Sequence, residues 1–198
     1  LDFMERGMLP MDKMRFVVCD EVDRMFDIGF REDIRRILTA CSNRQQTMFV
    51  SATINDEIER MVSRYMNNPQ RVFTRTGEAQ LTNPEASQYY VGVQPWDKQR
   101  ALRMLIQNEK PNLAIVFCRT KRSVDKVAHG LELDGVNASP IHGDLMQAKR
   151  ERVMRGFRTG KIQVLVATDL ASRGIDVHEI THVINYDVPE DPEAYVHR

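Results

Sequence analysis

A short apolar run that ends abruptly in acidic residues constrains this chain more than any other feature. Residues 16–19 read Phe-Val-Val-Cys and are followed by Asp20, Glu21 and Asp23. The run is too short for a helix and rich in strand-favouring residues, so it predicts a buried strand of a parallel sheet. Ligands of open α/β sheets bind beyond the carboxyl ends of strands, where such acids would hold a metal ion and order a water molecule. Acids at this position also commonly cap the next helix, and the octapeptide alone leaves both interpretations open.

Apolar runs and amphipathic segments alternate along the rest of the chain. Strands are predicted at residues 46–50, 113–118, 138–141, 164–167 and 182–186, and helices at residues 31–40, 56–66, 98–107, 123–133 and 147–157. This alternation predicts an α/β fold with mainly parallel sheets flanked by helices. A polar stretch at residues 75–87 interrupts the rhythm, and residues 88–93 start a new extended segment. We therefore expect two domains, residues 1–74 and 88–198, joined by a linker.

The charge of the chain is balanced overall but uneven locally. The 28 basic and 28 acidic residues give a formal net charge of zero, so overall charge gives no argument for a nucleic-acid partner. One segment is strongly basic and contains a single acid, Glu151; its cations are Lys149, Arg150, Arg152, Arg155, Arg158 and Lys161. A solvated helix face is the usual reason for such a cluster.

The cysteines and the apolar segments bear on the compartment. Cys19, Cys41 and Cys118 are odd in number and widely spaced, which suggests neither a disulfide framework nor a zinc site. We expect Cys19 and Cys118 to be buried as small apolar residues. No segment approaches the roughly 18 apolar residues that span a bilayer, and no signal peptide is visible, so we expect no membrane partner. These features favour an intracellular protein of the reducing cytoplasm.

Six short signatures occur in one order along the chain. The first two are Asp20-Glu21-Val22-Asp23 and Ser51-Ala52-Thr53, and the last is Tyr195-Val196-His197-Arg198. Between them lie Val-Phe-Cys-Arg-Thr-Lys at residues 116–121, His-Gly-Asp at 142–144 with Gln147 and Arg150, and Ala-Thr-Asp-Leu-Ala-Ser-Arg-Gly-Ile-Asp at 167–176. Any one signature is weak. Together they make nearly the whole chain resemble the DEAD-box family of ATP-dependent RNA helicases, which implies two RecA-like domains, the first of them incomplete.

The resemblance implies catalytic and coupling roles in the first domain. Asp20 would hold Mg²⁺ through water, and Glu21 would orient and deprotonate the water that attacks ATP. Asp23 would link the ATP site to Ser51 and Thr53, which would couple the nucleotide state to RNA strand separation. A helix cap formed by Asn55 or Thr53 is the structural alternative for this segment, and the two roles are compatible.

In the second domain the resemblance implies contacts to the RNA backbone, independent of base sequence. The residues concerned are Arg119, Thr120, Lys121, Gly143, Gln147, Arg150, Thr168 and Arg173. Asp176 would reach the ribose of ATP, and His197 and Arg198 would make coupling contacts between the domains. Helix capping is the alternative for residues 119–121, which follow a strand and open a helix. The chain has a single tryptophan and no array of aromatic residues for base stacking, which favours backbone-directed binding.

The chain departs from the family pattern in three respects. Val22 stands where the family usually has alanine, a change between small apolar residues that keeps the three carboxylates. No Gly-x-x-x-x-Gly-Lys-Thr/Ser loop is present, and the chain stops at Arg198, before two further arginines that the family carries. We therefore expect a fragment cut at both ends, with little ATPase activity when isolated. The alternatives are an RNA-binding module without hydrolysis and a DNA-directed helicase or translocase.

Overall fold

The computed structural model describes residues 1–27, 29–73, 86–171, 175, 177, 179–190, 192–196 and 198, except for the side chains of Arg24, Asp27 and Glu193. The chain divides into two compact units, Leu1–Gly77 and Glu78–Arg198. This division falls within the stretch proposed as a linker, residues 75–87, most of which lies outside the described residues. The exact domain boundaries therefore stay a prediction.

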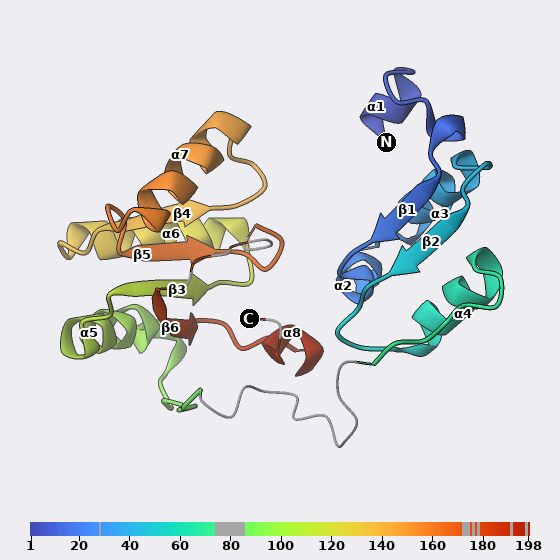
Figure 1. The fold of residues 1–198 in the computed structure, drawn as a ribbon. Coiled ribbons are helices and arrows are strands. Elements are labelled where there is room, and N and C mark those ends of the chain that lie inside the picture. The colour runs from blue at the N-terminus through green and yellow to red at the C-terminus, as the bar shows by residue number, and fades with distance from the viewer. Residues whose placement is uncertain are drawn as a thin grey trace. The chain divides into compact units, whose positions relative to one another are not determined.

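The first unit contains two parallel strands and the helices that follow them (Figure 1). Strand β1 (Phe16–Cys19) pairs with β2 (Gln46–Phe49) in register from Phe16↔Gln46 to Cys19↔Phe49. The predicted helices at 31–40 and 56–66 are α3 (Arg31–Ala40) and α4 (Asp56–Tyr65). Three short elements were not predicted: α1 (Asp2–Glu5), the 3-10 helix η1 (Met11–Lys13) and α2 (Val22–Asp27).

The core of the first unit lies on one face of the strand pair. Cys19 of β1 packs with buried residues of the three helices, namely Val22, Phe26, Ile34, Leu38, Ile58 and Met61. The prediction of a fully buried β1 was wrong for its other face, because Phe16 and Val18 are 65% and 56% exposed. Alternate strand residues point to opposite faces, and among the described residues the helices α2, α3 and α4 all pack on the side of Cys19.

The second unit is a four-stranded parallel sheet with helices on both faces. Its strands are β3 (Leu113–Phe117), β4 (Ala138–Ile141), β5 (Val164–Ala167) and β6 (Ile180–Asn185), in the order β4-β5-β3-β6. Its helices are α5 (Lys98–Glu109), α6 (Lys121–Leu133), α7 (Gln147–Arg158) and α8 (Pro192–Val196), with a 3-10 turn η2 (Pro95–Asp97) before α5. The predicted strands and long helices are confirmed, with ends shifted by up to two residues. Residues 88–93 form neither helix nor strand.

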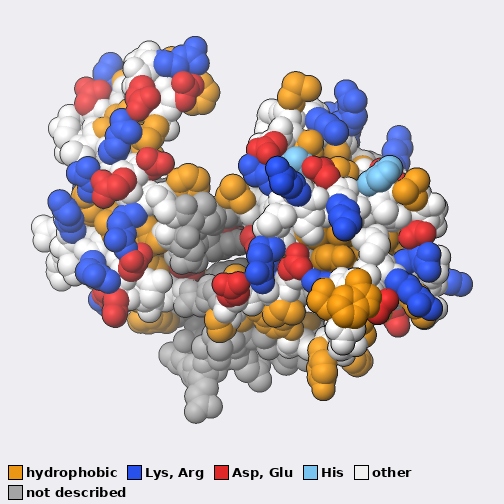
Figure 2. All heavy atoms as spheres, turned by 180° about the vertical axis from the view of Figure 1, so that it is seen from behind, with side chains coloured by type: hydrophobic (Ala, Val, Ile, Leu, Met, Phe, Trp, Pro, Cys, Tyr) orange, Lys and Arg blue, Asp and Glu red, His pale blue; other side chains and the backbone are white. Residues whose placement is uncertain are grey.

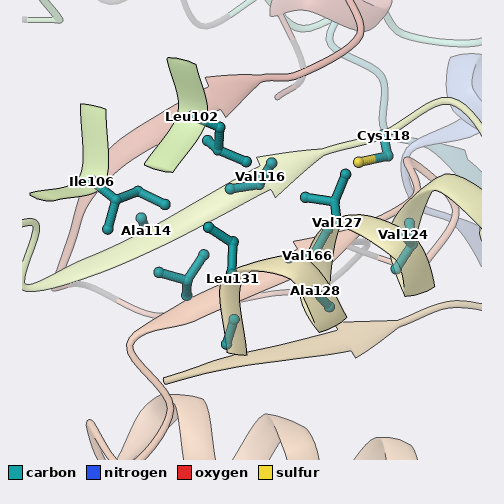
Figure 3. Packing of buried hydrophobic residues seen from close by; sticks show 12 residues of the cluster. Leu102, Ile106, Ala114, Val116, Cys118, Val124, Val127, Ala128, Leu131 and Val166 are labelled. Carbon is teal, nitrogen blue, oxygen red and sulfur yellow. The ribbon is translucent and has the colours of Figure 1, made fainter. Parts of the chain in front are cut away.

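The two faces of this sheet carry separate apolar clusters. On one face Leu102 and Ile106 of α5 and several α6 residues pack against Val116 and Val166, as Figure 3 shows. On the other face Val153 and Phe157 of α7 pack against Ile115 and Leu165. The chain crosses from β3 over β5 to β4 through α6 and returns to β5 through α7. Because such crossovers are right-handed, reversing direction moves the helix to the opposite face. Because all four strands are parallel, their carboxyl ends lie at one edge of the sheet.

The burial of Cys19 and Cys118 agrees with the sequence analysis. All three cysteines are free and buried. Burial raises the pKa of the Cys118 thiol to about 12, so this group stays protonated near neutral pH. Within the part of the chain that the structure describes, every helix is too short or too polar to cross a membrane.

Candidate functional site

In the first unit, the predicted site residues gather at the carboxyl edge of β1 and β2. The two strands are parallel neighbours, so the loop that holds Asp20 and Glu21 lies beside the loop that begins at Ser51. Backbone hydrogen bonds join the loops: Val50 N–H donates to Cys19 O at 2.9 Å, and Val22 N–H donates to Val50 O at 3.1 Å. The polar residues of both predicted signatures are thus held by the same ladder.

Asp23 is the buried centre of this edge. The residue is only 1% exposed. Its Oδ2 accepts hydrogen bonds from Ala52 N–H at 3.0 Å, from Thr53 N–H at 2.9 Å and from the Thr53 hydroxyl at 3.1 Å. A carboxylate buried this deeply needs such donors. These three bonds tie the acidic loop to the Ala52–Thr53 segment.

Asp20 and Glu21 lie in the open part of the edge. Both residues are exposed, and Asp20 Oδ1 accepts from Glu21 N–H at 3.0 Å. Glu21 has a φ of 50°, the left-handed region that non-glycine residues rarely adopt and that is concentrated at functional sites. Glu21 is therefore exposed only two residues before the buried Asp23.

The carboxylates at this edge suit a magnesium ion that keeps water ligands better than a metal ion held by protein ligands alone. Mg²⁺ keeps several water ligands and is commonly held by one or two carboxylates together with substrate phosphates. The exposed carboxylate of Asp20 meets that requirement. Among the described residues there is no cluster of three or more His, Cys, Asp or Glu that could hold a metal alone.

The segment after β2 both caps a helix and carries the candidate residues Ser51 and Thr53. Asn55 caps α4, because its side-chain oxygen accepts from Glu57 N–H at 3.2 Å and Ile58 N–H at 3.1 Å. Of the two cap residues considered from the sequence, Asn55 is therefore the one that acts. The Ser51 hydroxyl donates to Thr53 O at 2.6 Å and so closes the short turn between strand and helix.

In the second unit, an open depression of about 540 Å³ lies at the carboxyl edge of the sheet. Its lining comes from the loops after three strands: Arg119, Thr120, Lys121 and Arg122 after β3, Gly143 and Asp144 after β4, and Thr168 and Leu170 after β5. Five of these residues were candidate RNA contacts from the sequence. We call this depression the anion pocket, because backbone amides at the start of α6 and the cations around it favour a negative group.

Two contacts organise the anion pocket. The Thr120 hydroxyl accepts from Ser123 N–H at 3.1 Å and caps α6, so the capping alternative holds for this residue. Lys121 Nζ lies 2.5 Å from Asp144 Oδ1, and this ion pair is half exposed. The hydrogen bond from Lys121 lowers the pKa of Asp144. An anion entering the pocket would therefore meet a lysine already paired with a surface carboxylate.

The loop after β3 is fixed by an acid that the sequence analysis did not single out. Asp187, just beyond β6, accepts from Arg119 N–H at 2.9 Å and pairs with Lys98 at 2.6 Å. Burial alone would raise the pKa of Asp187, but these hydrogen bonds outweigh it and the pKa lies below its usual range. Lys98 also lies 4.4 Å above the ring centre of Tyr186. No local pattern marks Asp187, because its partners are distant in sequence.

Arg198 is buried in a polar network of the second unit. Its side chain is 3% exposed and makes two bonds to Asp169, at 2.6 and 2.9 Å. Nη1 also donates to Asn185 Oδ1 at 2.6 Å and to Asp187 O at 2.8 Å. The guanidinium lies 4.9 Å above the ring of Phe117. All these contacts join the ends of β3, β5 and β6, while the predicted coupling role of Arg198 stays a prediction.

The remaining candidates sit beside the pocket or outside the described residues. Gln147 and Arg150 lie in the first turns of α7, where Gln147 donates to Glu151 at 3.0 Å. His142, 4% exposed, faces Asp125 through Nε2 at 3.0 Å. The buried atoms His142 Nδ1 and Arg150 Nε lack a hydrogen-bond partner among the described residues. The candidates Arg173, Asp176 and His197 lie outside the described residues.

Two protein families match this chain. The helicase conserved C-terminal domain matches residues 97–198, and the DEAD/DEAH box helicase family matches residues 1–61. The chain belongs to the DEAD-box helicase family. The two matches cover the strand-end sites of the first and the second unit respectively.

Curated DEAD-box relatives align with the whole chain. It is 47% identical to the DEAD-box ATP-dependent RNA helicase CshA of Geobacillus kaustophilus and 43% identical to CshA of Streptococcus pneumoniae, each over 198 residues. The chain spans 42% and 37% of the length of these two relatives.

Solved DEAD-box structures resemble it as well. A DEAD box protein from Methanococcus jannaschii is 38% identical with a TM-score of 0.55, and the match covers all of this chain and 53% of that one. Dbp5 of S. cerevisiae, bound to RNA and ADP BeF3, is 29% identical with a TM-score of 0.84 and is covered to 52%. The RecA-like α/β fold expected from the sequence is confirmed.

Proposed function

We propose that this chain works as part of an ATP-dependent RNA helicase, which couples ATP binding and hydrolysis to RNA binding and local duplex unwinding. The observation that carries this proposal is that each of the two units has its own strand-end site. One presents two exposed carboxylates beside a buried, hydrogen-bonded aspartate, and the other presents cations and a hydroxyl around an anion pocket. The similarity to CshA and to RNA-bound Dbp5 supports the same reaction.

The first unit supplies groups for phosphoryl transfer to water. Glu21, exposed and turned away from the core, would orient and deprotonate the attacking water. Asp20 would hold Mg²⁺ through water, and that ion would neutralise charge on the nucleotide phosphates. Asp23 would transmit changes at this site to Ser51 and Thr53, to which its hydrogen bonds already connect it.

The second unit supplies backbone contacts to RNA. Arg119, Lys121 and Thr168 line one pocket, and guanidinium, ammonium and hydroxyl groups bind phosphate oxygens without reading base identity. Gly143 has no side chain to fill the pocket, and Lys121 is the nearest side chain to the space that a Cβ would occupy there. Gln147 and Arg150 would extend these contacts along the start of α7. The free, buried cysteines favour the cytoplasm as the compartment.

Replacing Glu21 by Gln tests the catalytic assignment. In the full reading frame that contains this chain, Glu21→Gln should lower RNA-stimulated ATP hydrolysis by at least about 100-fold, the lower end for a lost general base, while ATP affinity changes little. Steady-state phosphate release and nucleotide titration measure the two quantities. Glu32→Gln, an exposed change on α3 in a surface ion pair, is the matched control. Unchanged turnover in Glu21→Gln would remove Glu21 from the mechanism.

A further inference from the structure

The basic segment noted in the sequence forms an exposed and unpaired face of α7. Its members are Lys149, Arg152, Arg155 and Arg158, together with Lys161 just beyond the helix, and all five are exposed. Among the described residues, no ion pair or side-chain hydrogen bond involves their charged groups. We call these five residues the basic face. Figure 1 shows α7 beside β4 and β5, and Figure 2 shows Lys and Arg side chains spread among Asp and Glu over the visible face of the second unit.

The basic face differs from the other arginine-rich helix of the chain. On α3, every arginine has a carboxylate partner: Arg31 pairs with Glu57, Arg35 with Glu32 and Arg36 with Glu5. A solvated surface helix of a neutral protein usually balances its charges in this way. The basic face has only Glu151 beside it, and Gln147 donates a hydrogen bond to that carboxylate.

Helix electrostatics do not account for the basic face either. Cations stabilise the last turn of a helix, which covers Arg155 and Arg158. Lys149 and Arg152 lie in the first two turns, where the helix dipole disfavours positive charge, and the first turn carries no acid. Lys149 and Arg152 thus stand where the helix dipole disfavours positive charge, which favours a negatively charged binding partner as the reason for them.

The geometry of α7 spaces the cations along one helix. Val153 and Phe157 are buried on the side away from Arg152, Arg155 and Arg158, and they anchor the helix to the sheet. Lys149 lies one turn before Val153, at the edge of the buried side. Arg152 and Arg155 are one turn apart, so their Cα atoms are separated by about 4.5 Å along the axis, and the 12-residue helix is about 18 Å long. A row of charges of this length, carried by an anchored helix, suits a repeating anion better than a single one.

We propose that the basic face binds the phosphate backbone of the RNA segment that continues beyond the anion pocket. The helix begins three residues after Asp144 of the pocket, so one RNA strand can leave the pocket and follow α7. This inference rests on the proposed function and adds a second, sequence-independent contact to it. Its effect would be to lengthen the stretch of RNA held by the second unit.

Charge removal on α7 tests the inference. The double variant Arg152→Gln/Arg155→Gln is compared with Arg100→Gln/Lys126→Gln, which removes the same charge from exposed positions of α5 and α6 on the other face of the sheet. Binding of the whole chain to a long poly(U) RNA is followed by fluorescence anisotropy over a salt series. The α7 variant should bind about tenfold more weakly at low salt, and its log–log salt slope should fall by about 1.4, as expected for two lost single-strand phosphate contacts.

Short RNA separates the two surfaces. A poly(U) oligonucleotide just long enough for the anion pocket should bind both variants equally, and Lys121→Gln should weaken the binding of both lengths. If the α7 variant and its control bind long poly(U) alike, the basic face is a solvated surface and only this inference fails. If the unchanged chain does not bind poly(U) at low salt, this inference and the proposed function both fail. Binding of polyglutamate, but not RNA, that depends on Arg152 and Arg155 would indicate an acidic protein partner and overturn the proposal.

Discussion

At the scale of single residues, one buried and one partly buried acid hold the strand-end loops in place. Asp23 receives three hydrogen bonds from the Ala52–Thr53 segment, and Asp187 receives the amide of Arg119 and the ammonium of Lys98. In each case an acid from one strand end fixes the loop of another. The acids that shape the sites are therefore different residues from the exposed groups that would meet ligands.

The lowered pKa of Asp187 predicts a dependence of stability on pH. Because the folded pKa lies below the ordinary value of about 4, ionised Asp187 stabilises the second unit above that pH, and this contribution is lost as the pH falls through the folded pKa. Asp187→Asn should lower the free energy of unfolding by about 1–3 kcal/mol at pH 7 and flatten its decline below pH ~4. Urea unfolding of the second unit, followed by Trp96 fluorescence, measures both.

Asp134→Asn controls for the change in net charge, because it removes one carboxylate from the more exposed ion pair with Arg103 in the same unit. Equal pH profiles for Asp187→Asn and the unchanged chain would mean that Asp187 contributes nothing to acid sensitivity.

At the scale of elements, the Ser51–Thr53 turn and the anion pocket each lie between a strand end and a capped helix. Asn55 caps α4 after β2, and Thr120 caps α6 after β3. A side-chain cap satisfies one or two free amides and fixes the angle at which the chain leaves the strand. The caps therefore position the Ser51–Thr53 turn and the anion pocket, and a capping residue can serve a site without touching its ligand.

Loss of the Asn55 cap should loosen the start of α4 locally. Asn55→Ala removes the acceptor for Glu57 N–H and Ile58 N–H, at a cost of about 1 kcal/mol. Amide hydrogen exchange in the first turn of α4 should then be about fivefold faster, measured by mass spectrometry. Asn67→Ala, at an exposed position beyond the helix, is the control. Unchanged exchange in Asn55→Ala would show that the cap does not determine local stability.

At the scale of the whole molecule, the sequence predicted the long helices and the strands well, but it did not predict which strand faces are buried. The helix at residues 31–40 was predictable because its apolar spacing is regular, whereas α1 and α8 span too few residues to show a period. The exposure of Phe16 and Val18 could not be predicted, because a short apolar run does not reveal which of its faces is covered.

Some residues of the candidate sites could be proposed from the sequence, and others could not. Asp20, Glu21 and Lys121 could be proposed from short signatures, because each signature stands between a strand and the helix that follows it. Asp187 and the network around Arg198 were missed, because their partners come from strand ends far apart in the sequence. The left-handed backbone of Glu21 was equally hidden, as glutamate has no local preference for that conformation.

The most direct test of the central claim is ATP hydrolysis by the full reading frame in the presence of RNA or DNA. We predict that poly(U) RNA strongly stimulates phosphate release and that poly(dT) of the same length does not. Equal stimulation by the two polymers would identify a DNA-directed or unselective translocase, and RNA binding without any hydrolysis would identify a binding module. Either result would contradict an ATP-dependent RNA helicase.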